Sequence, residues 1–278
     1  MPQNIYDALG NSNLKKVFED IIAASAALGV DFFGVGALVQ NIWYLENNKM
    51  PRGTKDIDFG VYMPDERTYS DLKFELINEY GYVQAENNAF CLISPDGIQL
   101  DLLPFGEIEN DGKVMIEGKG LIDISLDGFV EVYKNGLRSV DIDSQTIKVC
   151  SIPAVVLLKL IAFDDRPEQR YKDPLDISSV MKHYHLLEDA LIWEEYNRFF
   201  DGDLDSPEIG IMVIGCEMRK ITKNNLRLHA RINDILDRGI QLSSSLAVRM
   251  IVSGSDETVE EKQNLLKLLK KGLNETVC

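Results

Sequence analysis

The chain has 278 residues, and its 45 acidic and 29 basic residues give a formal net charge of −16 at pH 7. Its 45% apolar and 27% charged residues are typical of a folded globular chain and exclude a disordered or fibrous one. The acidic excess argues against a broad surface for duplex DNA, because such binding needs many Lys and Arg contacts to phosphate. The length suits two domains of ordinary size.

Targeting signals are not expected from the sequence. The longest apolar stretch, residues 152–163, contains Lys159, so it predicts no membrane span. The first residues lack the basic and apolar regions of a secretory signal. The four cysteines are widely spaced and form no C-x-x-C pair, which favours reduced thiols and a cytoplasmic location.

The first 62 residues alternate between helical and extended patterns. Apolar residues at helical spacing predict a helix over residues 12–28. A short strand over 31–34 leads into Gly34-Val35-Gly36-Ala37, and a second helix is expected over 38–46. Residues 55–62 alternate between apolar and polar side chains, which predicts a strand.

Further sheet elements are expected up to residue 150. The predicted elements are a helix over 64–80, a hairpin of residues 89–94 and 98–103, and short strands at 129–133 and 146–149. The hairpin turn is predicted from Pro95-Asp96-Gly97, because proline and glycine favour tight turns.

From Pro153 onward the pattern is mostly helical. Helices are expected over residues 154–163, 175–184, 186–200, 208–221 and 257–271. The change of pattern near residue 150 predicts two domains, residues 1–150 and residues 151–278.

The clearest chemical pattern is the segment Arg52-Gly53-Thr54-Lys55-Asp56-Ile57-Asp58. Residues two apart on a strand share a face, so Asp56 and Asp58 present their carboxylates together, with Cα atoms roughly 6.5 to 7 Å apart. Such a pair suits a two-metal site for phosphoryl or nucleotidyl transfer, with Mg²⁺ as the expected ion. The structural alternative is a solvated strand face.

Two further features favour a site over that alternative. Asp101 lies among apolar residues of a predicted strand, where an ionised carboxylate is costly without a partner. It either reaches the same metals or is an edge or bulge residue. The segment Gly34-Val35-Gly36-Ala37 lies between a predicted strand and helix, where backbone N–H groups bind anions or simply form a tight turn.

Taken in chain order, the glycine turn, the R-x-T-x-D-I-D segment and the later aspartate resemble the polymerase-β-type nucleotidyltransferase superfamily. The motifs similar to the AbiEii/AbiGii toxin-like nucleotidyltransferases are Val35–Ala37, Arg52–Gly60, Asp101–Gly106 and Lys159–Phe163, followed by Arg166 and Lys172-Asp173. This resemblance covers roughly residues 12 to 185. It implies an α/β (α+β) fold, with a mixed-sheet nucleotidyltransferase core and a mostly helical C-terminal domain that completes the nucleotide and acceptor cleft.

The resemblance also implies a function. The enzyme would use Mg²⁺ or Mn²⁺ to transfer a nucleoside monophosphate from an NTP substrate to an acceptor hydroxyl, releasing pyrophosphate. It implies that Asp56, Asp58 and Asp101 are catalytic and hold the metals, and that Asp101 takes the acceptor proton. Implied nucleotide-binding residues are Gly34, Gly36, Ala37, Arg52, Thr54, Lys159, Arg166, Lys172 and Asp173. The implied acceptor is tRNA or a protein, as for a toxin with a partner antitoxin.

Two other functions stay open at this point. Ala37 and Gln40 depart from the Gly-Ser turn and the arginine common in such proteins, which suits a non-catalytic relative that binds a nucleotide or a partner. A small-molecule nucleotidyltransferase of the antibiotic-modifying kind shares the catalytic parts and differs in the acceptor. For Asp173, capping a helix that begins at Pro174 explains the residue as well as chemistry does. Arg166 either contacts phosphate or belongs to a charged helix end.

Overall fold

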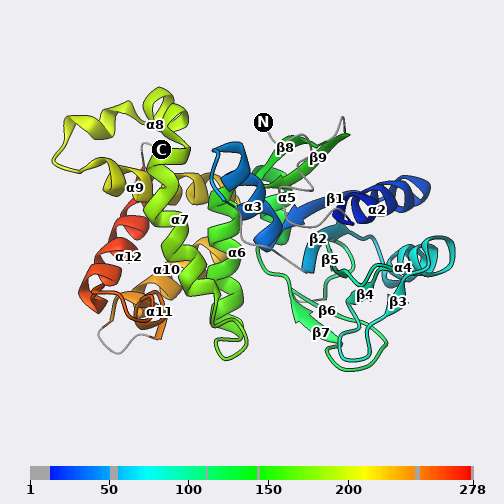
Figure 1. Cartoon of the computed structure of the whole chain (residues 1–278). Helices are drawn as coiled ribbons and strands as arrows, with labels where there is room; N and C mark the ends of the chain where they lie inside the picture. Colours follow the sequence, from blue (N-terminus) through cyan, green and yellow to red (C-terminus); the bar gives the residue numbers. More distant parts are fainter. Residues whose placement is uncertain (1–12, 51–55, 111, 143–144, 242–244, 277–278) are drawn as a thin grey trace. The chain divides into compact units, whose positions relative to one another are not determined.

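The structure is a computed structural model and describes residues 13–50, 56–110, 112–142, 145–241 and 245–276 (Figure 1). The chain divides into two compact units. The first contains the residues up to Tyr133 together with Leu137–Ser151, and the second contains Lys134–Gly136 and the residues from Ile152 onward. Within the described residues, no helix combines the length and the apolar character needed to cross a membrane.

The first unit is built on a seven-stranded mixed sheet with the strand order β3-β4-β5-β2-β1-β9-β8. Its strands are β1 (Phe32–Val35), β2 (Asp56–Tyr62), β3 (Val83–Gln84), β4 (Cys91–Ile93), β5 (Gln99–Phe105), β8 (Leu137–Ile142) and β9 (Gln145–Cys150). A separate hairpin consists of β6 (Lys113–Met115) and β7 (Asp123–Ser125). The helices that accompany these strands are α2 (Leu14–Leu28), α3 (Gly36–Glu46), α4 (Glu66–Tyr80) and α5 (Phe129–Asn135).

Strand β2 lies near the middle of this sheet, and its alternating sequence explains its place. The apolar residues Ile57, Phe59 and Val61 are fully buried. β2 pairs antiparallel with β1 and parallel with β5. A parallel pair needs a long connection, which here contains α4, β3 and β4. The carboxylate of Asp65 starts α4 by accepting a hydrogen bond from the backbone N–H of Thr68 at 2.7 Å.

The second unit is helical. Its elements are α6 (Ile152–Asp165), α7 (Asp173–Leu187), α8 (Asp189–Glu195), the 3-10 helix η1 (Asn197–Asp201), α9 (Ser206–Thr222), α10 (Leu226–Ile240), α11 (Ser245–Arg249) and α12 (Val259–Leu273). Helix α9 packs against α6, α7 and α12. Gly215 and Gly272 lie where α9 and α12 touch, and a Cβ atom at either position would clash with the backbone of the other helix.

The predicted mixed sheet and the mostly helical second half are confirmed. Two local predictions are wrong. Residues 129–133 form the start of helix α5 and not a strand, because Phe129 and Val132 bury their side chains three residues apart, on one face of a helix. The single helix predicted over 186–200 is divided into the end of α7, α8 and η1.

The cysteines divide into two kinds. Cys91 and Cys150 are free and buried, as expected for reduced thiols. Cys216, in α9, is disulfide-bonded, so the expectation of reduced thiols is wrong for this residue.

Candidate active site

The aspartates predicted from the sequence lie at one end of the central strands. Val35, the last residue of β1, pairs with Asp58 of β2. On the other side of β2, Asp101 of β5 is the register partner of Asp58. Neighbouring strands lie about 4.8 Å apart and register partners share a face, so these two carboxylates are side by side. Asp56 precedes Asp58 by two residues and lies on the same face.

The glycine turn lies against one of these aspartates, Asp58. Gly36 has a φ of +69°, a left-handed conformation that favours glycine. A Cβ atom on Gly36 would lie 2.5 Å from Asp58 Oδ2, so the glycine also makes room for the carboxylate. Because α3 begins at Gly36, the carboxylate lies against the first turn of that helix, whose partial positive charge stabilises it. The structure therefore brings Gly36 against Asp58, whereas Gly34 is the register partner of Phe59, one residue further along β2. Phosphate contacts from Gly34 and Ala37 stay predictions.

Asp101 is held by a neighbour that the sequence did not indicate. The side-chain amide of Asn88 donates a hydrogen bond to Asp101 Oδ1 at 3.4 Å. Asn88 is itself fixed, because its Oδ1 accepts a hydrogen bond from the backbone N–H of Phe90 at 3.0 Å. Asn88 precedes the predicted hairpin strand by one residue, and only the turn geometry of the fold directs its side chain to Asp101.

A buried thiol, Cys91, and a buried phenol, Tyr69, lie beside the aspartates, and the pKa of each is raised. Cys91 pairs with Asp101 across the antiparallel strands β4 and β5. Burial, followed by the charge and hydrogen bond of Asp101 and the charge of Asp58, raises the pKa of Cys91 to about 12. The pKa of Tyr69 is also raised well above its ordinary value, mainly by burial and then by Asp101. Both groups stay protonated at neutral pH.

The carboxylate oxygens at this end of the central strands suit a hard divalent cation. Like charges on directly opposite strand residues destabilise a sheet, so a cation between Asp58 and Asp101 would relieve that cost. Mg²⁺ is usually bound by one or two carboxylates together with water and substrate phosphates. Across the described residues, no group of three or more His, Cys, Asp or Glu side chains is arranged to hold a metal by itself. Metal binding by all three aspartates therefore stays a prediction.

Lys159, predicted to contact phosphate, is part of a buried ion cluster in the second unit. Its ammonium donates to Asp173 Oδ1 and to Asp176 Oδ2, each at 2.8 Å. The side chains of Lys159 and Asp173 are only 12% and 8% exposed. Burial lowers the pKa of Lys159, but the attraction of both carboxylates outweighs burial and raises it overall. The ammonium of Lys159 is thus held in place, and the two carboxylates offset its charge.

The remaining predicted residues lie around the start of α7 or outside the described residues. Asp173 does not cap α7, because Lys172 occupies the N-cap position and makes no side-chain capping bond. Lys172 is exposed, with its ammonium 5.8 Å from the centre of the Tyr171 ring, and Arg166 is half-buried. Arg52 and Thr54 fall outside the described residues. Nucleotide contacts from all these residues stay predictions.

Neither a protein-family model nor a curated protein sequence matches the chain. Among solved structures, the chain is similar to the antibiotic-resistance factor ANT(2'')-Ia in solution, with 12% identity, a TM-score of 0.37, and coverage of 67% of this chain and 92% of that chain. The crystal structure of ANT(2'')-Ia in complex with adenylyl-2''-tobramycin shows 13% identity, a TM-score of 0.40, and coverage of 79% and 99%.

A third similar structure is an antigenic nucleotidyltransferase-like protein from Paracoccidioides brasiliensis, with 13% identity, a TM-score of 0.37, and coverage of 66% of this chain and 89% of that chain. Likeness at these TM-scores assigns no function to this chain. Its function therefore rests on the residues around Asp58 and Asp101.

Proposed function

We propose that this protein is a metal-dependent nucleotidyltransferase that moves a nucleoside monophosphate from an NTP to an acceptor hydroxyl. One observation carries the proposal. Asp58 and Asp101 are register partners on adjacent parallel strands, and the Asp58 carboxylate lies against Gly36 at the start of α3. A cation-binding pair of carboxylates beside an anion-binding helix start suits a triphosphate bound together with a divalent ion.

In this proposal, different residues of the first unit bind the metal, bind the phosphates and accept the proton. Asp56, Asp58 and Asp101 hold Mg²⁺ or Mn²⁺, which when bound neutralises phosphate charge and makes the α-phosphorus more electrophilic. Backbone N–H groups around Gly36 and Ala37 bind phosphate oxygens at the positive end of α3. A carboxylate oxygen of Asp101 accepts the proton of the acceptor hydroxyl. The hydrogen bond from Asn88 orients that carboxylate.

The second unit is proposed to complete the nucleotide and acceptor cleft. Lys172, which is exposed, and Arg166 are assigned to phosphate contacts. Lys159 is assigned a supporting role in nucleotide binding, because it holds Asp173 and Asp176 at the start of α7. For the acceptor, we propose tRNA or a protein with an antitoxin as partner, as the AbiEii resemblance implies.

Transfer of radioactive label tests this proposal. The full chain is incubated with each of the four α-³²P-labelled NTPs and Mg²⁺ or Mn²⁺, and label is measured in total RNA, total protein and an aminoglycoside pool. We expect label in one pool, lost in Asp58→Asn and Asp101→Asn, and kept in Asp96→Asn, which changes an exposed aspartate of the β4–β5 turn.

The outcomes of this experiment separate the three candidate functions. Label in the aminoglycoside pool alone would replace the tRNA or protein acceptor by a small molecule. Label that survives both site variants would overturn the assignment of Asp58 and Asp101. NTP binding with no label in any pool would favour the non-catalytic alternative.

A further inference from the structure

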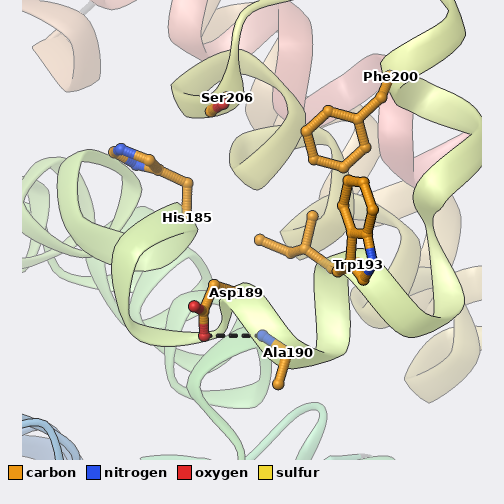
Figure 2. Close-up of a pocket in the computed structure, with 7 residues that line it drawn as sticks. His185, Asp189, Ala190, Trp193, Phe200 and Ser206 are labelled. Atoms are coloured by element: carbon orange, nitrogen blue, oxygen red, sulfur yellow. Dashed lines mark hydrogen bonds between the residues drawn. The ribbon is translucent and has the colours of Figure 1, made fainter.

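The second unit contains a cavity that the proposed reaction does not use. It lies between the end of α7, helix α8 and the start of α9, and its volume is about 370 Å³ (Figure 2). Among its lining residues are Asp189, Trp193, Phe200 and Ser206. This volume lies in the range of about 300 to 1,000 Å³ that is common for pockets that bind small groups.

One wall of the cavity is aromatic and exposed. The rings of Trp193 and Phe200 contact each other, with centroids 5.3 Å apart and planes inclined by 60° (Figure 2). Trp193 is 65% exposed and Phe200 is 40% exposed. Trp43, the other tryptophan of the chain, is by contrast fully buried. Tryptophan is enriched at the centres of protein interfaces, and exposed aromatic surface of this kind marks a binding face.

The chain around this wall is strongly acidic. Residues 188–208 contain eight acidic side chains and one basic side chain, Arg198. Asp189 is one of the residues that line the cavity, and its Oδ1 accepts a hydrogen bond from the backbone N–H of Ala190 at 2.8 Å (Figure 2). A cation is therefore favoured twice, by the negative field of the segment and by the face of the tryptophan ring.

We propose that this cavity binds an arginine side chain of a basic segment in a partner protein. Arginine suits the site better than lysine, because its planar guanidinium stacks on aromatic rings and pairs with a carboxylate at the same time. A polypeptide suits the site better than a small cation, because a ligand confined to the cavity would leave the rim of Trp193 in water. The neighbouring residues of a bound segment cover that rim.

Calorimetric titration with an arginine-rich hexapeptide, capped at both ends, tests the proposal at physiological salt. We expect saturable one-to-one binding by the full chain and no binding of a hexaglutamate peptide. Trp193→Ala weakens binding at least tenfold, and Asp189→Asn weakens it several-fold. The asparagine keeps an oxygen for the N–H of Ala190, so α8 retains its start. Binding by Trp193→Phe, which keeps an aromatic face, lies between that of the wild type and that of Trp193→Ala.

Two matched controls lie in the first unit. Phe74→Ala removes an aromatic side chain that is 68% exposed, and Asp96→Asn removes an exposed carboxylate. Both variants should bind like the wild type. The proposal is overturned if no saturable binding occurs, or if Asp96→Asn weakens binding as much as Asp189→Asn. Methylguanidine that binds as tightly as the peptide would replace the partner protein by a small organic cation. If Trp193→Ala loses its helical circular dichroism, the binding affinities of Trp193→Phe and Asp189→Asn test the proposal in its place.

Discussion

Aspartates gather in both units, and the described surroundings of the two clusters differ. In the first unit, Asp58 and Asp101 are adjacent on parallel strands, and their negative field raises the pKa of the buried Cys91 thiol beyond the effect of burial itself. In the second unit, Asp173 and Asp176 share the ammonium of Lys159, whose pKa is raised in turn. The first cluster lies in a negative field beside the start of α3, whereas the second is built around the ammonium of Lys159.

This difference suggests two roles, ligand binding for the first cluster and structural support for the second. A negative field beside a helix start suits a site that takes up a divalent cation with its nucleotide. A buried lysine between two carboxylates instead fixes the geometry of α6 against α7. Variants of the first cluster should therefore lose transfer activity, and variants of the second should lose unfolding free energy.

The largest expected effect is on activity, in Asp58→Asn. The substitution removes a carboxylate from the proposed metal site, so the rate of nucleotidyl transfer should fall by about 10³-fold or more. The free energy of unfolding should change by no more than about 1 kcal/mol, because the removal of a like charge opposite Asp101 offsets the lost attraction to the start of α3. Single-turnover transfer and urea unfolding measure the two effects. A fall in stability that accounts for the lost activity would contradict this separation.

Lys159→Met should show the reverse pattern. It leaves Asp173 and Asp176 without their shared cation at buried positions, which should cost about 3 to 5 kcal/mol of unfolding free energy. Urea unfolding measures the loss. The control is Lys148→Met, which removes an exposed lysine of β9 and should change stability by about 0.5 kcal/mol or less. A Lys159→Met variant as stable as this control would contradict a structural role for the ion cluster.

Gly36→Ala tests the contact between the glycine turn and Asp58. Its added Cβ meets Asp58 Oδ2, whereas Gly29→Ala adds a Cβ at a similar φ, +66°, with no atom within 4 Å. Both variants should lose about 1 to 2 kcal/mol of stability through the left-handed backbone. Only Gly36→Ala should also lose transfer activity, by about tenfold to 10²-fold, because the carboxylate is displaced. Equal activities in the two variants would show that this contact does not matter.

The smallest expected effect is in the pH dependence of the Lys159 cluster. A lysine whose folded pKa is raised contributes stability that is fully present below the unfolded pKa of about 10.4 and is lost as pH rises through the folded pKa. The stability difference between wild type and Lys159→Met should therefore stay constant between about pH 7 and about pH 10. A difference that already declines near about pH 8 or 9 would mean that burial dominates and that the pKa is lowered.

The sheet was largely predictable because its residues carry strong local patterns. The alternation of residues 56–62 and the turn of Pro95-Asp96-Gly97 give β2 and the β4–β5 hairpin directly. Helix α10 was not predicted, although Leu228, Ile232 and Ile235 bury one face and Asn225 caps the start. The break after α7 also escaped prediction, because Asp189 competes for a backbone N–H in a segment of continuous helical propensity.

The order of residues along the chain indicated the site in part. Asp56 and Asp58 share a face by strand geometry alone, and Asp101 could be placed on a neighbouring strand. The register that sets Asp101 opposite Asp58 depends on the connection through α4, which no local pattern determines. Asn88 and the pairing of Lys159 with Asp173 and Asp176 join residues 13 to 17 positions apart, so they required the folded structure.

Metal binding tests the central claim most directly. Mn²⁺ can replace Mg²⁺ at oxygen sites and is observed by electron paramagnetic resonance. We predict that wild-type protein and ATP together bind Mn²⁺ more tightly than ATP alone, that Asp58→Asn and Asp101→Asn lose this gain, and that Asp96→Asn keeps it. Equal Mn²⁺ binding by the wild type and both site variants would contradict a metal site at Asp58 and Asp101.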